Sequence, residues 1–319
     1  MRRTTLITLT AVSALALSAC GGSDSDSGDG GSSADGGTTA VTVGVLPVPD
    51  TAAMYLGVDQ GFFSDEGLDV TLQPTTGGAA AVPGVVSGTY DFAFGNYLSG
   101  MVAADTGLPL KYVTNATTAT PESGFQAVVV PKDSPIQTPA DLAGKRVSVN
   151  NLANINDTTI RGVVDADGGD SDDIEFVEVA FPDAVAAVTN GQVDAATVNP
   201  WTSSMEDEFR VITYNFTDYT EDLDIAGFFT SNETIADDPE LVESFQTAMN
   251  KSLEFAQENP DEVRRIILTY TKLSEETVQE LVLPVFRTEI NRDALEELGK
   301  SAAEYGTIKE EPDLDTLLP

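Results

Sequence analysis

The sequence predicts an α/β protein of two similar lobes, each a mostly parallel β-sheet flanked by helices, with a helical segment at the C-terminus. Short apolar runs alternate with amphipathic stretches between residues 40 and 214, which is typical of parallel strands covered on both faces by helices. The alternation restarts near residue 125, which indicates two lobes. After about residue 229 the strand-like runs stop and acidic amphipathic segments follow.

The first half opens with a β-branched run at 41–46, which predicts a buried strand that ends at Pro47. Asp50 and Thr51 then look like the N-cap of a helix that ends at Gly61. Pro83 lies inside the next expected helix and predicts a kink or a late start. The remaining strands of this half are expected at 69–73, 91–94 and 110–114, and the helices at 76–87 and 97–105.

The second half repeats the pattern with strands expected at 126–130, 146–150, 174–179, 193–198 and 210–214. Thr138 followed by Pro139 is a typical helix start, and further helices are expected at 157–166 and 182–189. The C-terminal part predicts four helices with no strand between them, at 239–259, 261–270, 274–281 and 292–305.

The N-terminus reads as a targeting segment. Arg2 and Arg3 precede a short apolar run, 6–17, which is too short to span a bilayer as a helix. Small residues then lead to Cys20, and this resembles the lipobox of bacterial lipoproteins. We therefore expect a signal peptide at 1–19, a lipid on Cys20, a Gly/Ser/Asp tether at 20–40 and an extracytoplasmic protein held at the cell membrane. The alternative is a plain secretory signal that happens to end near a cysteine.

Composition excludes several kinds of chemistry. The chain has no histidine and one cysteine, so a Ser-His-Asp triad, a Cys-His pair and a Cys-rich metal site are all ruled out. The formal net charge of −36 repels polyphosphate, so nucleic acid is not an expected partner. Paired acids at 172–173 and 237–238 are more simply surface positions than metal ligands. We expect no cofactor, no metal and a monomer.

An internal similarity marks where a ligand is expected. Residues 87–97 and 190–201 share one order: a helix end, a glycine, an aspartate, a short apolar strand, an asparagine and an aromatic residue. The glycine precedes the aspartate by three positions and the asparagine by eight in both copies. Asp91 and Asp194 come before their strands, so we expect both to be structural.

Ligands of open parallel sheets bind at the carboxyl ends of the strands. The residues expected there are rich in Asn, Thr and Gly, with aromatic residues beside them and no Lys or Arg, which favours binding over catalysis. The candidate ligand-binding residues are Asp50, Thr51, Tyr55, Gly77, Gly78, Asn96, Tyr97, Asn115, Asn150, Asn154, Asn156, Asp157, Thr158, Asn199 and Trp201.

Each of these residues also has an ordinary structural interpretation. Asn and Thr at strand ends are common in turns and caps, and Asp50 and Asp157 are good N-caps. Trp201 is the only tryptophan, and a lone tryptophan is often part of a core. The four asparagines within 150–156 are the strongest local signal, because so many amides are unusual in a plain turn.

Four segments, 41–50, 55–70, Gly77-Gly78 and 133–147, resemble the substrate-binding proteins of ABC importers. The resemblance covers about residues 41–305 and is to the nitrate, sulfonate, taurine and thiamine-precursor binders, the SsuA/THI5-like or NMT1-like group. It implies a type II periplasmic-binding-protein fold with lobe 1 at 41–124 plus 230–319 and lobe 2 at 125–229. The chain would cross near 125–127 and return near 225–229.

The resemblance also implies a function. A small polar organic ligand is captured between the lobes, and the closed protein docks on a permease with an ATPase partner. The ligand class stays open among sulfonates, taurine, nitrate and thiamine-pyrimidine-like molecules. The residues at the strand ends slightly favour a small polar organic ligand, for example a planar nitrogen-containing molecule, over an inorganic anion. The candidate loops hold no cation. Arg161 lies one turn into the helix after Asn156 and Asp157, and we expect it to be a solvated helix residue; the alternative is that it reaches inward to the site.

Two other functions remain alternatives. One is a ligand-sensing receptor that hands its bound state to a signalling partner. The other is an enzyme resembling thiamine-pyrimidine synthases, which use an active-site histidine that this chain lacks. Hydroxymethylbilane synthase shares the lobe architecture but attaches its cofactor through a cysteine, and the only cysteine here is Cys20 of the lipobox.

Overall fold

The computed structural model describes residues 38–122 and 124–319. The expected signal peptide, the lipidation site Cys20 and nearly all of the tether lie outside the described residues. Within the described part of the chain, no helix is both long enough and apolar enough to cross a membrane.

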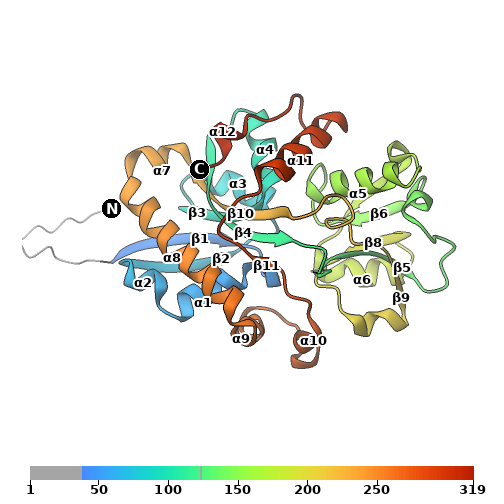
Figure 1. Cartoon of the computed structure of the whole chain (residues 1–319), viewed down its shortest axis with the longest axis horizontal. Coiled ribbons are helices and arrows are strands. Elements are labelled where there is room, and N and C mark those ends of the chain that lie inside the picture. The colour runs from blue at the N-terminus through green and yellow to red at the C-terminus, as the bar shows by residue number, and fades with distance from the viewer. Residues whose placement is uncertain (1–37, 123) are drawn as a thin grey trace, which may run out of the picture. The chain divides into compact units, whose positions relative to one another are not determined.

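A six-stranded sheet has the strand order β11-β4-β10-β3-β1-β2 (Figure 1). Its strands are β1 (Thr39–Val45), β2 (Leu68–Pro74), β3 (Phe92–Asn96), β4 (Leu110–Ala119), β10 (Leu223–Ser231) and β11 (Val285–Phe286). β1 runs parallel to β2 and β3, whereas β10 is antiparallel to β3 and β4, and β11 is antiparallel to β4.

A five-stranded sheet has the order β7-β6-β8-β5-β9. Its strands are β5 (Ala127–Pro131), β6 (Arg146–Val149), β7 (Glu175–Glu178), β8 (Ala195–Val198) and β9 (Phe209–Thr213). β6 is parallel to β7 and β8, and β5 is antiparallel to β8 and β9. We call the six-stranded sheet with its helices lobe 1 and the five-stranded sheet with its helices lobe 2.

The expectation of α/β lobes with mostly parallel sheets is confirmed. Both sheets are mixed, because β10 and β11 run against the other four strands of their sheet and β5 runs against the other four of its sheet. The chain crosses from β4 to β5 and returns from β9 to β10, so β5 and β10 each enter a sheet from the other lobe. A helix that covers the sheet between two consecutive strands makes those strands parallel. Among the described residues, β5 and β10 have no such helix before them, because the chain reaches each of them by crossing from the other lobe. Residues 225–229, where a return crossing was expected, lie inside β10 of the six-stranded sheet. The exact boundaries of the lobes stay a prediction.

Helices flank both sheets. Lobe 1 carries α1 (Ala52–Asp59), α2 (Phe62–Asp65), α3 (Gly78–Val86), α4 (Tyr97–Asp105), α7 (Asn232–Asp237), α8 (Pro239–Glu258), α9 (Pro260–Tyr270), α10 (Glu275–Glu280), α11 (Arg292–Glu304) and α12 (Leu314–Leu317). Lobe 2 carries α5 (Ile155–Ala166) and α6 (Phe181–Thr189). Short 3₁₀ helices lie at η1 (Pro49–Thr51), η2 (Pro139–Leu142), η3 (Ser171–Asp173) and η4 (Ser203–Asp207).

Two local expectations need correction. The Thr138-Pro139 start leads only to η2, a single 3₁₀ turn. A strand, β11, separates α10 from α11, although the sequence predicted helices alone in this region. A strand of two residues is too short to produce a period-two pattern, and β11 exists because it pairs with the long strand β4.

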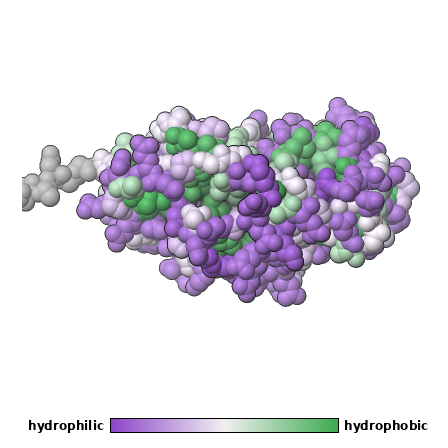
Figure 2. Space-filling model, turned by 90° about the horizontal axis from the view of Figure 1, so that it is seen from above, coloured by the Kyte–Doolittle hydropathy of each residue, from purple (hydrophilic) through white to green (hydrophobic). Residues whose placement is uncertain are grey.

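The core of lobe 1 is built around stacked phenylalanines. Phe245 of α8 lies parallel to Phe92 of β3, with ring centroids 3.8 Å apart, and Phe228 of β10 meets it edge-on. All three side chains are buried, and burying one aromatic side chain of this size stabilises by roughly 1.5–3 kcal/mol. This packing fixes α8 against the centre of the sheet. Figure 2 shows a mostly hydrophilic outer face with scattered apolar side chains, which suits a strongly acidic protein.

Asp91 and Asp194 have the same structural task in the two lobes. The Oδ2 atom of Asp91 accepts the backbone N–H of Thr42 at 2.7 Å, and Oδ2 of Asp194 accepts that of Arg146 at 2.8 Å. Each aspartate also donates its backbone N–H to the carbonyl of its partner, Asp91 to Thr42 and Asp194 to Arg146. The expectation that both aspartates are structural is confirmed, and the repeat predicted from the sequence exists at this level.

Candidate functional site

A narrow cavity of about 40 Å³ lies between the lobes. Lobe 1 and its returning strand β10 line it with Leu46, Val48, Asp50, Gly77, Gly78, Phe94, Asn96, Ile225 and Ala226. Lobe 2 and the crossing segments contribute Gln126, Asn150, Ile155, Asn156, Phe181, Asn199 and Phe216. The volume is enough for a few water molecules at most. The lining contains no Lys or Arg, and its single charged residue is Asp50.

The structure brings seven of the fifteen predicted site residues together in this cavity: Asp50, Gly77, Gly78, Asn96, Asn150, Asn156 and Asn199. They come from both halves of the sequence, as the internal similarity predicted. The other eight lie elsewhere, and each has a specific structural contact or a place in the packed interior.

Side-chain amides of lobe 2 form a connected network with Gln126 at its centre. Nε2 of Gln126 donates to Oδ1 of Asn156 at 2.7 Å and to Oδ1 of Asn215 at 3.2 Å. Asn156 in turn donates to Oδ1 of Asn150 at 2.8 Å. The Asn215 amide donates to Thr159 of α5 at 2.8 Å. This network holds the polar wall of lobe 2 in one arrangement.

Asp50 faces this network from lobe 1. Its side chain is 5% exposed, and its Oδ2 accepts one hydrogen bond from Nδ2 of Asn199 at 3.3 Å. Burial raises the pKa of the Asp50 carboxyl to about 6, against the opposing effect of the hydrogen bond from Asn199. A buried carboxyl with a shifted pKa in a cleft is typical of a functional site.

Asn199 bridges the two walls. Its Nδ2 lies 3.3 Å from Asp50 and 3.4 Å from Oε1 of Gln126, so both neighbours are acceptors and fix the orientation of the amide. Its Oδ1 is buried and has no hydrogen-bond partner among the described residues. An unpaired buried acceptor is costly, at about 1–3 kcal/mol, and native structures contain few of them.

The start of α3 forms a wall made of backbone. Gly77 has φ of +151°, a conformation that favours glycine, and a Cβ at this position would lie 2.3 Å from Oδ1 of Asn151 in lobe 2. A Cβ on Gly78 would lie 2.7 Å from Cα of Gly95 at the end of β3. Glycine is therefore required at both positions for the lobes and the sheet to approach this closely.

Asn96 and Asn154 cap helices on opposite sides of the cleft. Oδ1 of Asn96 accepts the N–H of Ser99 at 2.9 Å, which caps α4. Asn154 caps α5, and its Nδ2 donates to Oγ of Ser99 at 3.2 Å. The Ser99–Asn154 contact joins the lobes beside the cavity, so Asn154 acts across the cleft without lining the cavity.

The expectation that Asp50 and Asp157 are N-caps is wrong. Asp157 is the third residue of α5 and accepts the N–H groups of Ala153 at 2.7 Å and Asn154 at 2.6 Å, which makes it the acidic half of a capping box. Asp50 lies inside η1 and caps no helix. Thr51 donates its hydroxyl to the carbonyl of Leu46 at 2.8 Å instead of capping α1.

The aromatic candidates lie in packed surroundings. Tyr55 stacks on Tyr270 with ring centroids 3.7 Å apart, and Tyr97 is fully buried. Trp201 is 3% exposed and belongs to the core of lobe 2 with Phe209. Thr158 is buried within α5. None of these side chains lines the cavity.

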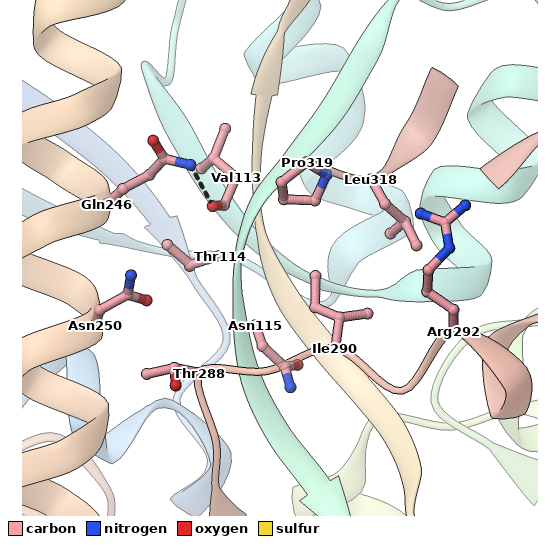
Figure 3. A pocket seen from close by; sticks show the side chains of 10 residues that line it. All are labelled: Val113, Thr114, Asn115, Gln246, Asn250, Thr288, Ile290, Arg292, Leu318 and Pro319. Atoms are coloured by element: carbon pink, nitrogen blue, oxygen red, sulfur yellow. Dashed lines mark hydrogen bonds between the residues drawn. The ribbon is translucent and has the colours of Figure 1, made fainter. Parts of the chain in front are cut away.

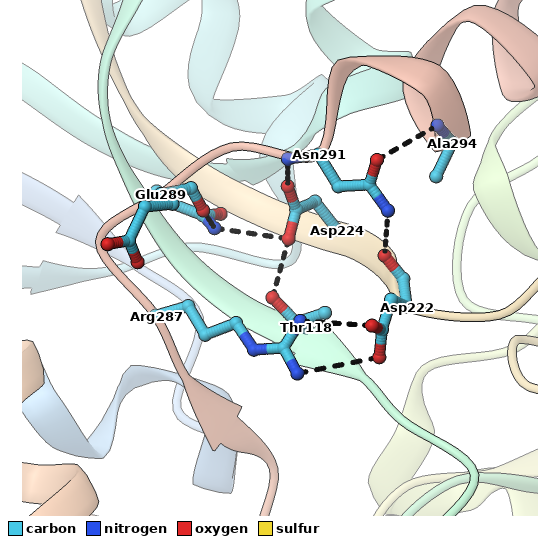
Figure 4. Close-up of polar contacts among 8 residues, drawn as sticks. Thr118, Asp222, Asp224, Arg287, Glu289, Asn291 and Ala294 are labelled. Atoms are coloured by element: carbon cyan, nitrogen blue, oxygen red, sulfur yellow. Dashed lines mark hydrogen bonds and ion pairs between the residues drawn. The ribbon is translucent and has the colours of Figure 1, made fainter.

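Asn115 belongs to a different polar cluster, centred on Asp224 (Figure 4). The Oδ1 atom of Asp224 accepts from Nδ2 of Asn115 at 3.1 Å and from Oγ1 of Thr118 at 2.5 Å. Its Oδ2 accepts the N–H of Asn291 at 2.5 Å. Burial raises the pKa of Asp224 although these bonds and Arg287 oppose it. The cluster fastens the segment before α11 onto β4 and β10.

Asn115 also lines a second cavity, of about 310 Å³ (Figure 3). Its lining residues are Val113, Thr114, Asn115, Gln246, Asn250, Thr288, Ile290, Arg292, Leu318 and Pro319. All of them belong to lobe 1, so movement of the lobes does not close this cavity. The expectation placed Asn115 after a strand ending at residue 114, but β4 continues to Ala119.

Sequence reasoning missed part of the cavity lining. Gln126 and Ile225 stand near the amino ends of β5 and β10, and only carboxyl ends of strands were considered. Because these two strands run antiparallel to their neighbours, their amino ends lie at the same edge as the carboxyl ends of the others. Phe94, Phe181 and Phe216 add aromatic surface that no polar pattern signalled. The described residues contain no group of three or more His, Cys, Asp or Glu side chains able to hold a metal ion.

Known proteins share this architecture. The structure superposes on the alkanesulfonate-binding protein SsuA of Xanthomonas axonopodis pv. citri with a TM-score of 0.68 and 16% sequence identity. The superposition covers 87% of this chain and 96% of SsuA. For the nitrate-binding protein NrtA of Synechocystis PCC 6803 the TM-score is 0.71 at 13% identity, with 88% of this chain and 86% of that one covered. The two-lobed fold is therefore the type II periplasmic-binding-protein fold.

Sequence comparison points to the same group. The formylaminopyrimidine-binding protein of Halalkalibacterium halodurans is 25% identical over 221 residues, which is 68% of this chain. The match spans 65% of the length of that relative. The family model described as NMT1/THI5 like matches residues 48–263, which is more than half of the chain. The chain thus belongs to the NMT1/THI5-like family.

Proposed function

We propose that this protein is the extracytoplasmic solute-binding component of an ABC importer. It captures a small polar organic ligand between its lobes and delivers it to a permease with its ATPase. The observation that carries the proposal is the cavity itself, which is lined from both lobes by amides and bare backbone. Family membership supports the same function.

Ligand capture requires the lobes to separate and close. The cavity of about 40 Å³ is far smaller than a typical ligand pocket of roughly 300–1,000 Å³. Hydrogen bonds that join the lobes here, Asn199 to Asp50 and Asn154 to Ser99, must break to admit a ligand. A ligand that contacts both walls then shifts the population towards the closed form. The two sheets mark the lobes, and the β4–β5 and β9–β10 crossings form the hinge.

The lining favours a planar nitrogen-containing ligand over an inorganic anion. Phe94, Phe181 and Phe216 provide flat apolar surface, and the amides around Gln126 both donate and accept hydrogen bonds. The formylaminopyrimidine-binding relative is named for a molecule of this kind. Sulfonates, taurine and nitrate, by analogy with SsuA and NrtA, are the competing ligand class.

Arg161 gives no support to the anionic class. Its guanidinium donates to the carbonyl of Ser171 at 2.8 Å and lies 5.2 Å from the ring centroid of Phe176. It is not among the residues that line the cavity. The guanidinium of Arg161 is therefore engaged within lobe 2 and does not reach the site.

The protein acts as a monomeric binder without a cofactor. The alternative of a thiamine-pyrimidine-synthase-like enzyme is disfavoured because the sequence has no histidine for the chemistry that those enzymes perform. A receptor for a signalling partner would use the same cleft. Cross-linking in cells separates the two binding functions: capture of a permease supports import, and capture of a sensor kinase supports signalling.

A lipid on Cys20 holds the receptor near its permease and so raises its effective concentration there. The Cys20→Ser variant should move from the membrane fraction to the soluble extracytoplasmic fraction. The unmodified chain run in parallel is the control. Persistence of the variant in membranes would contradict lipid anchoring.

A thermal-shift screen of the purified protein tests the binding function. The panel holds alkanesulfonates, taurine, nitrate and thiamine-pyrimidine precursors. A ligand at 100 times its dissociation constant should stabilise the fold by about 2.7 kcal/mol, which is a shift of several degrees. If no compound shifts the midpoint and no molecule is released when the host-purified protein is denatured, the proposal fails.

A further inference from the structure

The wall of the cleft presents acceptors without a cation. Asp50 and Asn199 are both buried, with exposed fractions of 5% and 8%. Both line the cavity, whose lining contains no Lys or Arg. Moving a carboxylate out of water is costly unless it is paired or hydrogen-bonded, so such a residue needs an explanation.

Hydrogen-bond accounting singles out Asp50 among the buried carboxylates. Asp157 accepts the N–H groups of Ala153, Asn154 and Thr158. Asp50, in contrast, receives a long hydrogen bond of 3.3 Å from the side chain of Asn199, and the only backbone group that lowers its pKa is its own N–H.

Asp224 of lobe 1 resembles Asp157, because its carboxylate oxygens also accept several hydrogen bonds from the fold. It accepts three hydrogen bonds, from Thr118, Asn115 and the backbone of Asn291, and Arg287 lowers its pKa as a nearby positive charge. A carboxylate has about four acceptor positions. The two carboxylates outside the cavity are thus satisfied by the fold, whereas the one inside the cavity keeps acceptor positions free for a ligand.

Asn199 adds a second acceptor beside the first. Its Nδ2 is turned towards Asp50 and Gln126, both of which present oxygen atoms, so its Oδ1 is fixed as the unpaired atom. The cleft therefore offers a carboxylate and an amide oxygen on adjacent side chains. A ligand satisfies both only by bringing N–H or O–H donors.

We propose that Asp50 and Asn199 form a subsite for an amino, amidine or ammonium group of the ligand, and that the cleft selects against sulfonate and nitrate. This inference rests on the proposed binding function and specifies its ligand class. An anion placed beside Asp50 would face like-charge repulsion with no cation in the lining to offset it. An N–H donor replaces the long bond from Asn199 with a charge-assisted one.

The subsite predicts proton-linked binding. The Asp50 carboxyl, with its pKa near 6 because of burial, must be ionised to pair with a cationic donor. The titratable groups that interact with it are Tyr270 and, beyond it, Tyr55. Burial raises the pKa of both, so both stay neutral across the pH range of the test. The affinity for a probe of constant charge should therefore fall about tenfold between pH 7.5 and pH 5.

Isothermal titration of the purified protein tests the subsite with probes of opposite polarity. The N–H donors are 4-amino-2-methylpyrimidine and benzamidine, and benzamidine keeps its charge across the pH range. The anions are benzoate, which matches benzamidine in shape, together with ethanesulfonate and nitrate. The variants are Asp50→Asn and the control Asp69→Asn, which removes one charge from an exposed position of β2.

We expect a donor probe to bind at least tenfold more tightly than any anion. The Asp50→Asn variant should weaken that binding by roughly tenfold to a hundredfold, the usual effect of losing a charge-assisted hydrogen bond, and Asp69→Asn should leave it unchanged. Tighter binding of an anion, or an unchanged donor affinity in Asp50→Asn, would overturn the subsite and leave the importer function standing.

If no probe binds, the molecule released from host-purified protein decides the question by mass spectrometry. A molecule with an amino or amidine group supports the subsite, and an anion without N–H donors overturns it. If nothing is released either, the proposed binding function fails, and the subsite fails with it.

Discussion

Burial of the Asp50 carboxyl predicts how the free energy of unfolding depends on pH. Its pKa is 3.8 in the absence of the fold and about 6 within it, because burial disfavours the charged form. Between these values the folded chain holds a proton that the unfolded chain has lost. The free energy of unfolding therefore falls as the pH rises from 4 to 6, and the full cost of about 3 kcal/mol is present above pH 6.

The Asp50→Asn substitution removes this cost while keeping the shape of the side chain. At pH 7.5 and without ligand, the variant should be more stable than the unmodified protein by about 1–3 kcal/mol, because the contact with Asn199 is worth less than burial of the charge. For a chain of this size this is roughly 2–4 °C per kcal/mol in the melting midpoint. Such a gain in stability with a loss of binding is the usual trade at a functional site.

Urea unfolding of both proteins at pH 7.5 and pH 4.5 provides the measurement. The advantage of the variant should shrink by about 2 kcal/mol at the lower pH, where Asp50 is protonated in the folded unmodified protein. Comparing the two proteins at each pH removes the contribution of all other acidic groups. A variant that is less stable at pH 7.5, or whose advantage is the same at both pH values, would refute the reasoning.

Three further substitutions probe other parts of the structure. Tyr305→Phe removes the 2.9 Å hydrogen bond from the residue that follows α11 to Asp165 of α5. The ligand-free protein should therefore scatter X-rays with a larger radius of gyration and bind ligand a few-fold more weakly, by about 0.5–1.5 kcal/mol. An unchanged radius would contradict this. Gly77→Ala places a Cβ against the opposite lobe and should reduce the ligand-induced thermal shift. Its control Gly67→Ala, with φ of +74° and open space around it, should not. Asp224→Ala removes three hydrogen bonds and should cost about 2–4 kcal/mol in urea unfolding, and a loss below 1 kcal/mol would show that the cluster is not structural.

The sequence predicted the elements whose signal is local. The β-branched run at 41–46 corresponds to β1, and the amphipathic stretch at 239–259 corresponds to α8. Chain crossings leave no local signal, because the direction of β5 and β10 follows from where the chain comes from. The mixed sheets therefore could not be predicted from composition or periodicity.

The same limit explains the errors at the site. Asn115 belongs to a polar run, 114–118, that resembles a loop, but this run is buried in β4 because β10 and β11 pair on either side of it. Gln126 is the first residue of the strand expected at 126–130, and the amino end of a strand carries no signal for a ligand site. The asparagines within 150–156 were found, because a dense group of amides is visible without knowing the fold.

The glycines at the start of α3 divide the cleft into a fixed part and an adjustable part. A side chain on Gly78 would meet the backbone of Gly95, and one on Gly95 would meet Gly78 in return, so neither position can acquire one alone. Changes in ligand preference by engineering must therefore come from lining positions that carry side chains: Asp50 in lobe 1, and Gln126, Asn156 and Asn199 in the opposite wall. The start of α3 therefore shapes the cleft through its backbone alone, and the choice of ligand depends on the side chains around it.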